Sequence, residues 1–283
     1  MFLVLAHLKF WLDKMLSFNN LGNLGRLANQ MFQYASLKGI ARNRGFDFVV
    51  PPKLEFGKRD TNVRESLSLE ETIYDIFPNL KDAPVGMVEN ELNYEVNHDF
   101  DENLFNNCSD NIDLFGYYQS PKYFEHIEDE IRHDFTFADS VIDSVKNMID
   151  EFQFGEKISL HIRRGDYLHN PNHPVQPIEY YQKALELLPK DIPVFVFSDD
   201  ASWCYSQEFF NGDRFMISDN NGVAIDLHIM TLCDYHIIAN SSFSWWGAWL
   251  SKSKKVIAPK DWFGADCAFK SVKDMEFGNW SWL

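Results

Sequence analysis

The sequence predicts an α/β fold with two Rossmann-like halves. Near the N-terminus, an apolar strand, a glycine-containing turn, a helical stretch and a second strand follow one another, which is the order of a parallel βαβ unit. Strands and helices alternate again from residue 157 onward. The strands of this second half are continuous apolar runs, as expected when helices cover both faces of a sheet. Two consecutive halves of this kind predict two facing domains with a ligand cleft between them.

The first half begins with a strand at residues 16–19, which leads into a turn that contains Gly22 and Gly25. Residues 29–44 have helical periodicity, and Gly45 marks the end of this helix. The rest of this half is predicted as a strand at 46–50 stopped by two prolines, a connecting region without a motif at 53–110, a strand end at 116–120 and a helix at 123–135.

The second half alternates more regularly. Its elements are predicted as strand 157–162, helix 178–188, strand 194–197, helix 224–233, strand 235–239, helix 244–250 and strand 255–257. With a boundary near 140–156, the chain is expected to comprise an N-terminal extension at 1–14, a first α/β domain at 15–150 and a second, Rossmann-like domain at 151–283.

Composition limits the classes of partner. Of 283 residues, 45% are hydrophobic, which indicates a globular protein, and 26 basic against 42 acidic residues give a net charge of −16. This charge disfavours nucleic acid and anionic membrane surfaces, so we expect neither as a general partner. A small anion can still bind where a few cations converge, because the local field outweighs the net charge at contact distance.

The cysteines and the apolar N-terminal segment indicate where in the cell the protein is expected. The four cysteines lie far apart in the sequence without a zinc-like spacing, so we interpret them as reduced thiols. The apolar run at residues 1–11 is interrupted by His7 and Lys9 and is shorter than the roughly 20 residues that cross a bilayer. We therefore expect no transmembrane segment and a cytoplasmic location, either free or peripheral at the inner membrane face.

Polar residues follow three strands of the second half at the point where each strand ends. The sequence Arg163-Arg164-Gly165-Asp166-Tyr167 follows the first, Ser198-Asp199-Asp200 the second and Asn240-Ser241-Ser242-Phe243-Ser244 the third. Because ligands gather beyond the carboxyl ends of the strands in open parallel sheets, these segments predict one binding site.

Each of these segments allows a functional and a structural interpretation. Adjacent arginines at a strand end point to opposite sides, so one can fork onto a diphosphate while the other anchors to a carboxylate, although surface salt bridging is the alternative. Residues 240–244 open a helix whose free N–H groups can bind phosphate, and capping by Ser242 or Ser244 is compatible with that role. Asp226 is either a charge at a helix start or the acceptor that pairs with the N–H donors of a guanine edge.

We predict neither a metal ion nor a cofactor. Asp199 and Asp200 follow Ser198 at a helix start, where acidic residues commonly serve as caps, and no Asp-x-Asp pair lies at a strand end. The tryptophans Trp245, Trp246 and Trp249 are predicted to pack in the core rather than to stack on sugars.

Four motifs resemble the family 11 α-1,2-fucosyltransferases. They are Gly25-Arg-Leu-Ala-Asn-Gln-Met-Phe-Gln-Tyr-Ala35, His161-Ile-Arg-Arg-Gly-Asp-Tyr167, Phe197-Ser-Asp-Asp200 and Asn240-Ser-Ser-Phe-Ser-Trp-Trp-Gly-Ala-Trp249, in this order. The resemblance covers the chain from about Met15 onward and departs from the family at Ala28, where glycine is usual. It implies a GT-B type fold, GDP-β-L-fucose as donor, inversion at the anomeric carbon, no divalent metal, and the 2-hydroxyl of a galactose residue in a glycan as acceptor. It also implies that domain 15–150 carries the acceptor side and domain 151–283 the donor.

The resemblance also implies residue roles. Arg163 or Arg164 is expected to contact the β-phosphate, His161 and Asp226 to approach the guanosine, and the segment Ser241-Ser242-Phe243 to add phosphate contacts. The full expected donor-binding set is His161, Arg26, Asn29, Ser198, Asp199, Asp226, Asn240, Ser241, Ser242 and Phe243. The alternative for Arg26 and Asn29 is that they only hold the glycine turn.

The expected chemistry is a single displacement in which Arg163, Arg164 and Asp166 are catalytic. The arginines compensate the charge of the leaving diphosphate. Asp166 is a candidate base or merely orients an arginine, and His169 and His173 are its rivals. A protein O-fucosyltransferase and a non-enzymatic glycan-binding module are the competing functions, whereas a nucleotide hydrolase is disfavoured because the chain has no Gly-x-x-x-x-Gly-Lys-Ser/Thr loop. Oligomeric state and the identity of the glycan are not predicted.

Overall fold

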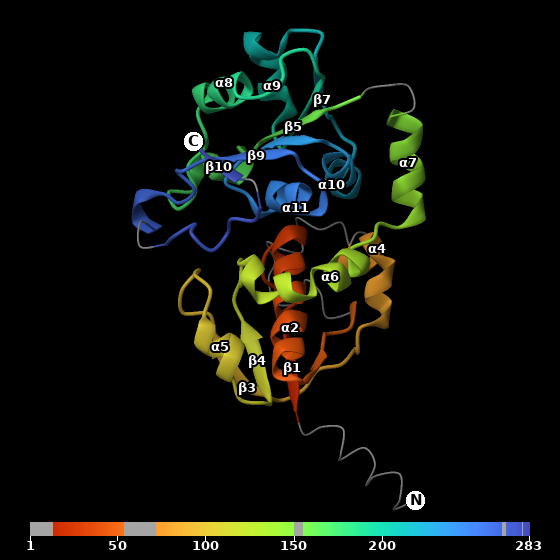
Figure 1. Ribbon diagram of the computed structural model, residues 1–283, viewed down its shortest axis with the longest axis vertical. Coiled ribbons are helices and arrows are strands. Elements are labelled where there is room, and N and C mark those ends of the chain that lie inside the picture. The colour runs from red at the N-terminus through yellow and green to blue at the C-terminus, as the bar shows by residue number, and fades with distance from the viewer. Residues whose placement is uncertain (1–13, 54–71, 150–154, 268–269, 279) are drawn as a thin grey trace, which may run out of the picture. The chain divides into compact units, whose positions relative to one another are not determined.

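The computed structural model describes residues 14–53, 72–149, 155–267, 270–278 and 280–283 (Figure 1). The chain divides into two compact units: the first reaches Ala138 and includes Lys273–Met275, and the second contains Asp139–Val272 and Glu276–Leu283. Of the predicted extension at 1–14, all but Lys14 lies outside the described residues.

The first unit contains a parallel four-stranded sheet with the order β2-β1-β4-β3. Its strands are β1 (Met15–Ser17), β2 (Asp47–Val49), β3 (Glu91–Tyr94) and β4 (Ile112–Phe115). Its helices are α2 (Leu27–Arg44), α4 (Ile73–Ile76), α5 (Glu102–Asn107) and α6 (Glu128–Asp134), with 3-10 turns η2 (Pro78–Asp82), η3 (Pro121–Tyr123) and η4 (Glu125–Ile127).

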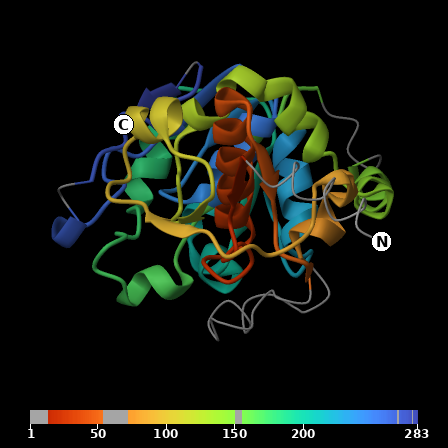
Figure 2. The same cartoon turned by 90° about the horizontal axis from the view of Figure 1, so that it is seen from below.

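Helix α2 lies against this sheet in both views (Figures 1 and 2). It contacts β1 and β2, and every residue from Leu27 to Ala41 except Asn29 is buried, so the helix is covered on all sides along most of its length. The helix ends where Gly45 takes the left-handed conformation with φ 65° and donates its N–H to the last carbonyls, as the sequence predicted. The predicted order of strand, glycine turn, helix and strand is therefore confirmed.

The prediction for residues 53–110 was wrong in its described part. That region holds β3, α4 and α5 rather than connecting structure alone. β3 escaped notice because it is an edge strand of four residues, three of them exposed, and so lacks an apolar run. The single helix expected at 123–135 is instead the 3-10 turn η4 followed directly by α6, because the backbone angles of Ile127, φ −123° and ψ 32°, break the α-helical path between them.

The second unit contains a parallel six-stranded sheet with the order β10-β9-β8-β5-β6-β7. Its strands are β5 (Ile158–Ile162), β6 (Val194–Ser198), β7 (Phe215–Ile217), β8 (Tyr235–Ile237), β9 (Lys255–Ala258) and β10 (Trp280–Trp282). Its helices are α7 (Asp139–Ile149), α8 (Ile178–Glu186), α9 (Ala201–Ser206), α10 (Val223–Thr231) and α11 (Ser242–Leu250), with 3-10 turns η5 (Gly165–His169), η6 (Glu208–Phe210) and η7 (Ala265–Cys267).

Helices cover both faces of this sheet. Val194 and Val196 of β6 belong to an apolar cluster that includes residues of α8, whereas Phe195 and Phe197 belong to a cluster that includes residues of α7 and α10. Because alternate residues of a strand point to opposite faces, both faces of β6 are buried. The predicted elements of this half are confirmed, but β7, β10, α7 and α9 were missed.

The strand order of the second unit fixes where a ligand is expected. Counted in chain order from β5, the sheet reads 3-2-1-4-5-6, which is the doubly wound Rossmann arrangement. From β5 the chain continues to β6 on one side, and from β8 it continues to β9 on the other. The carboxyl ends of β5 and β8 therefore flank the switch point, where open α/β sheets bind their ligands.

Two further predictions concern the core. Trp245, Trp246 and Trp249 are at most 1% exposed, so their predicted packing role is confirmed. All four cysteines are buried and free, as predicted.

Among the described residues, no helix combines the length and the hydropathy that crossing a bilayer would require.

Candidate functional site

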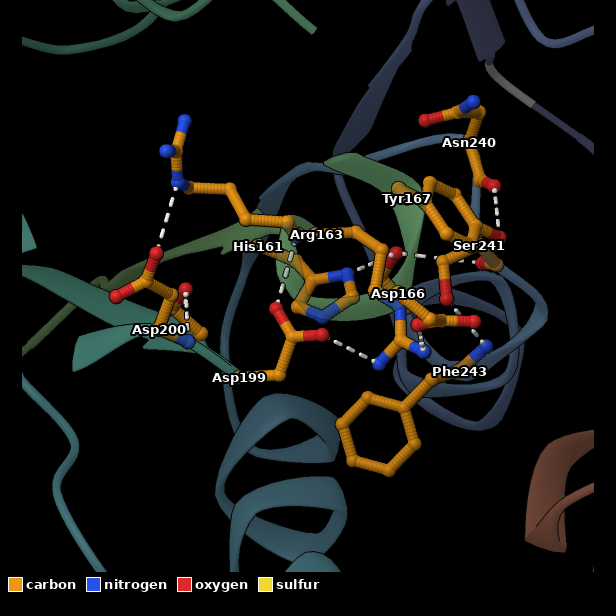
Figure 3. A network of polar contacts seen from close by, with 12 residues as sticks. His161, Arg163, Asp166, Tyr167, Asp199, Asp200, Asn240, Ser241 and Phe243 are labelled. Carbon is orange, nitrogen blue, oxygen red and sulfur yellow. Dashed lines mark hydrogen bonds and ion pairs between the residues drawn. The ribbon is translucent and has the colours of Figure 1, made fainter. Parts of the chain in front are cut away.

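Arg163 lies at the switch point of the second unit, directly after β5 (Figure 3). Its Nη1 donates to Asp199 Oδ2 at 2.8 Å, and its Nη2 is paired with Asp166. The guanidinium also lies over the ring of Tyr167, 5.1 Å from the centroid. Only 15% of the side chain is exposed, so Arg163 is a fixed cation rather than a mobile surface charge.

Arg164 points toward the neighbouring strand β6. Its Nε donates to Asp200 Oδ2 at 3.0 Å, and its guanidinium stacks 4.1 Å from the ring centroid of Trp203. Within the described residues, its two terminal nitrogens bond to no protein acceptor. The two arginines thus diverge, as predicted, but each is anchored to a carboxylate.

Asp199 organises both arginines. Besides holding Arg163, its Oδ1 accepts the backbone N–H of Arg164 at 2.8 Å. Gly165 leaves room for this carboxylate, because a Cβ at that position would overlap Asp199 Oδ2. The expected contact of Asp199 with the donor stays a prediction, and the structure shows Asp199 positioning the two residues that precede Gly165.

Asp200 and Ser198 have local structural roles. Asp200 caps α9 by accepting the N–H of Trp203 at 3.0 Å, which confirms the predicted capping role. Ser198 Oγ, expected to bind the donor, accepts the N–H of Asp200 at 3.0 Å. Both residues therefore fix the loop that carries Asp199.

His161 links β5 to α11. Its Nδ1 lies 2.9 Å from Ser244 Oγ, and its ring lies 5.6 Å from that of Phe243. Burial, and to a lesser extent the charge of Arg163, lower the pKa of His161 from 6.5 to about 3. The imidazole is therefore neutral at pH 7 and contributes hydrogen bonds rather than charge.

The N-terminus of α11 faces the same place. Ser241 caps this helix by accepting the N–H of Phe243 at 3.3 Å, and Ser242 begins its first turn. That turn contains no acidic residue, so the positive end of the helix dipole is not compensated within the helix. An anion at this position would meet the helix N-terminus and Arg163 together.

Asn240 was predicted to help hold phosphate, which stays a prediction, and its amide nitrogen has a structural role. It is 1% exposed, and its Nδ2 donates to the carbonyls of Pro174 and Trp262, each at 3.0 Å. Asn240 therefore ties together the loops that follow β5, β8 and β9. The motif at 240–249 did not predict that the Asn240 side chain would connect these loops.

The loop after β5 carries an aromatic stack that the sequence did not reveal. The ring of His173 lies 5.1 Å from that of Tyr167 at an interplanar angle of 20°, and 5.9 Å from that of Phe263. Tyr167 in turn donates its hydroxyl to the carbonyl of Asn240 at 3.1 Å. Of the other two predicted bases, Asp166 is paired with Arg163 and its side chain is 51% exposed, while His169 is exposed at the end of η5.

Asp226 lies in the first turn of α10, beyond the carboxyl end of β7. It accepts the hydroxyl of Ser218 at 2.5 Å, and Asn221 donates to that same hydroxyl oxygen at 2.8 Å. Burial raises the pKa of Asp226 from 3.8 to about 6, against the opposing effect of these hydrogen bonds. A partly desolvated carboxylate of this kind is suited to pair with two N–H donors of a ligand.

Arg26 and Asn29 belong to the first unit. Arg26 is the exposed residue that precedes α2, and Asn29 in the first turn accepts Gln119 Nε2 at 2.7 Å. Gly25 has φ 77°, and a Cβ there would overlap the Asn29 side chain, so Asn29 packs tightly on the glycine turn. This contact favours the structural interpretation of Asn29 that the sequence left open.

Comparisons with known proteins cover nearly the whole chain. A family model described as Glycosyl transferase family 11 matches residues 6–283. An alpha-1,2-colitosyltransferase of Escherichia coli is 30% identical, with 84% of this chain and 90% of that protein covered. The O-antigen biosynthesis glycosyltransferase WbnK of Escherichia coli is 29% identical, with 88% and 96% covered. Galactoside alpha-(1,2)-fucosyltransferase 2 of Bos taurus is 28% identical, with 82% and 69% covered.

Solved structures share the fold at low identity. The NodZ alpha-1,6-fucosyltransferase soaked with GDP-fucose matches with a TM-score of 0.54 at 15% identity, over 84% of this chain and 93% of that chain. POFUT1 in complex with GDP matches with a TM-score of 0.50 at 14% identity, over 86% and 96%. Together with the parallel sheet in each unit, these likenesses confirm the predicted α/β, GT-B type fold class.

Proposed function

The chain belongs to glycosyl transferase family 11, and on this premise we propose that it transfers L-fucose from GDP-β-L-fucose to the 2-hydroxyl of a galactose residue in a glycan. The relatives named alpha-(1,2)-fucosyltransferase and alpha-1,2-colitosyltransferase support the α-1,2 linkage. The product is a fucoside of inverted anomeric configuration, together with GDP.

One observation supports the donor site above all. Arg163 is held by Asp199 at the switch point of a Rossmann-type sheet, beside the N-terminus of α11. A cation and a helix N-terminus that converge there match a diphosphate, whose charge increases as the sugar leaves. Asp226, with its raised pKa and its place beyond β7, fits the guanine edge of the same nucleotide.

The mechanism follows from this arrangement. The acceptor oxygen attacks C1 of the fucosyl group from the face opposite the diphosphate, and the C1–O bond breaks with its electrons going to GDP. Arg163 and the amide groups at the start of α11 stabilise that developing charge. We propose that they do so without a metal ion or other cofactor. Arg164 is anchored by Asp200 and Trp203 on the side of β6, so in this proposal Arg163 is the arginine that meets the diphosphate first.

A second donor deserves a direct comparison because an alpha-1,2-colitosyltransferase is 30% identical to this chain. A colitosyl group is a fucosyl group without its 3-hydroxyl. If the enzyme hydrogen-bonds that hydroxyl, GDP-colitose is a poor donor, since buried polar groups would then lose their partner.

The experiment is a donor and acceptor panel with purified protein. We expect GDP release and an α-1,2 linked product from GDP-fucose with a β-galactoside such as lactose, at the same rate with and without a chelator. Arg163→Ala should lower kcat by about 10²–10³-fold, as expected when a fixed donor to a developing anion is removed. Preference for GDP-colitose would refute the proposed donor, and transfer to a polypeptide alone would refute the proposed acceptor. Loss of activity with the chelator would refute the proposed metal independence.

A further inference from the structure

We propose that Ser218 is a positioning residue for nucleotide recognition: its hydroxyl holds the carboxylate of Asp226 toward the base and thereby sets the preference of the protein for guanine. This proposal rests on the proposed function, because it presupposes a guanine nucleotide that is bound beyond the sheet of the second unit. It assigns a role to residues around Asp226 that the sequence motifs do not include.

Ser218 lies at the edge of the sheet where the nucleotide is expected. It directly follows β7, and its backbone N–H donates to the carbonyl of Val196 in β6 at 2.8 Å. Because β5, β6 and β7 are parallel, the carboxyl end of β7 lies at the same edge as that of β5, which Arg163 follows. With β6 between them, β5 and β7 are about 10 Å apart. The ribose between a base and a diphosphate can span such a distance.

The loop between β7 and α10 folds back on Ser218. Asn220 and Gly222 have positive φ angles of 59° and 85°, and asparagine and glycine are the residues that take such angles most readily. This turn brings Asn221 Nδ2 to 2.8 Å from Ser218 Oγ. Asp226 follows in the first turn of α10, where its backbone N–H donates to the carbonyl of Gly222 at 3.1 Å.

The hydrogen bonds fix the direction in which the Ser218 hydroxyl points. Asn221 donates to Oγ, and the single hydroxyl proton is donated to Asp226 Oδ1 at 2.5 Å. A donor at this position favours the ionised carboxylate, which can only accept. Ser218 uses one of roughly four lone-pair positions of the carboxylate, and the side chain of Asp226 is partly exposed, so two N–H donors of a ligand can still approach.

A helix-capping role does not explain these contacts. A capping carboxylate accepts backbone N–H groups of the first turn, whereas no backbone N–H of the described residues donates to the side chain of Asp226. Its partner Ser218 lies outside the helix. Burial also raises the pKa of Asp226 from 3.8 to about 6, a cost that an exposed carboxylate at a helix start would not have. Carboxylates with such raised pKa values are typical of functional sites.

No neighbouring charge determines the ionisation of Asp226. Helices α7 and α11 pack against α10, and α11, β6 and β7 carry no acidic or basic side chain. The charged or titratable residues of α7, of the loop and of the rest of α10 are Asp139, Asp143, Lys146, Asp219 and His228. None of them acts on the pKa of Asp226, which burial raises and the hydrogen bonds with Ser218 and Asn221 lower. Removing the Ser218 hydroxyl should therefore raise this pKa further.

The test is the ratio of the dissociation constants for inosine diphosphate (IDP) and GDP, measured by calorimetry between pH 5 and 8. Hypoxanthine lacks only the 2-amino group of guanine, so the ratio isolates one N–H donor, and the titration of the terminal phosphate is common to both ligands. We expect the wild type to bind GDP about 10–150-fold more tightly than IDP above pH 6, as for a hydrogen bond to a charged group. Below pH 6 the ratio should fall, because a protonated carboxyl group presents a donor to a donor.

Ser218→Ala should reduce the ratio at pH 7 by about 2–10-fold, which corresponds to the net contribution of one hydrogen bond. It should also move the fall of the ratio to higher pH. In the Asp226→Asn background the same substitution should have no further effect, because Ser218 acts through the carboxylate. Ser218→Thr retains a hydroxyl and should preserve the ratio. Asp219→Asn, at an exposed carboxylate of the same loop, is the matched control and should leave the ratio unchanged.

An unchanged ratio and pH profile in Ser218→Ala would overturn the proposal, as would an equal loss in Asp219→Asn or additive losses in the double variant. A wild type that binds IDP as tightly as GDP would also overturn it, while the donor and acceptor panel would still decide on fucosyl transfer. Conversely, a wild type that selects GDP through Ser218 but turns over neither GDP-fucose nor GDP-colitose would support this inference and refute the proposed function.

Discussion

Replacing Asp199 with asparagine tests whether the arginines must be held in place to bind the nucleotide. The asparagine oxygen can still accept the N–H of Arg164, but its NH₂ group would face Nη1 of Arg163, which now lies 2.8 Å from a carboxylate oxygen. A hydrogen bond between charged groups is worth about 1.5–3 kcal/mol, and removing a negative charge beside the diphosphate returns roughly 1 kcal/mol. The net loss of about 0.5–2 kcal/mol corresponds to GDP binding that is about 2–30-fold weaker.

Calorimetric titration with GDP measures this loss, and two further variants provide the comparison. Gly165→Ala keeps the carboxylate but displaces it, because the new Cβ would overlap Asp199 Oδ2, so it should weaken GDP binding in the same direction. Asp166→Asn removes the half-exposed partner of Arg163, a carboxylate that accepts no backbone N–H among the described residues, and should leave GDP binding equal or tighter. If Asp199→Asn binds GDP as the wild type does while Asp166→Asn binds it more weakly, the assignment of Asp199 as the positioning residue is wrong.

Two other sites give further predictions. Asp226→Asn should raise Tm at pH 8 but not at pH 4. The pKa of Asp226 in the folded protein, about 6, lies above its ordinary value of 3.8, so ionising Asp226 destabilises the fold as pH rises through this interval, and asparagine avoids that cost. The same variant should bind GDP more weakly if the carboxylate pairs with guanine, and an equal or lower Tm at pH 8 would contradict the stability argument. Gly264→Ala should lower stability by about 1–3 kcal/mol, because a Cβ would overlap the carbonyl of Pro171 and shift the loop that carries His173. Thermal melts check this, and an unchanged Tm would contradict the predicted overlap.

The sequence predicted those elements whose local pattern coincides with burial. The strands at 158–162 and 194–198 are continuous apolar runs because helices cover both of their faces, and α2 stops at a glycine that takes the left-handed conformation. β3, β7 and β10 are edge strands or short strands of three or four residues, and their partners lie elsewhere in the chain. Their pairing depends on the assembled sheet, so local periodicity could not reveal it.

The sequence predicted where the candidate site lies more fully than it predicted which contacts each of its residues makes. That Arg163 and the start of α11 belong together follows from strand ends at one edge of a parallel sheet. That Asn240 braces two loops, or that Asp199 holds an arginine, depends on which loops meet above β5 and β6. The stack of Tyr167, His173 and Phe263 joins residues almost a hundred positions apart, and no spacing rule connects them.

The balance of charge at the switch point is compatible with the anionic donor that we propose. Arg163 and Arg164 are matched by three carboxylates, those of Asp166, Asp199 and Asp200, so this group alone carries a net charge of −1. Asp199 and Asp200 are each fixed by a backbone N–H, whereas Asp166 is on the surface with 51% of its side chain exposed. A diphosphate can therefore replace Asp166 on Arg163 at little cost, since an exposed ion pair contributes about 0–1 kcal/mol. Asp199 and Asp200 then remain as the supports that aim the arginines, and the proposed nucleotide would complete the neutralisation that Asp166 provides in its absence.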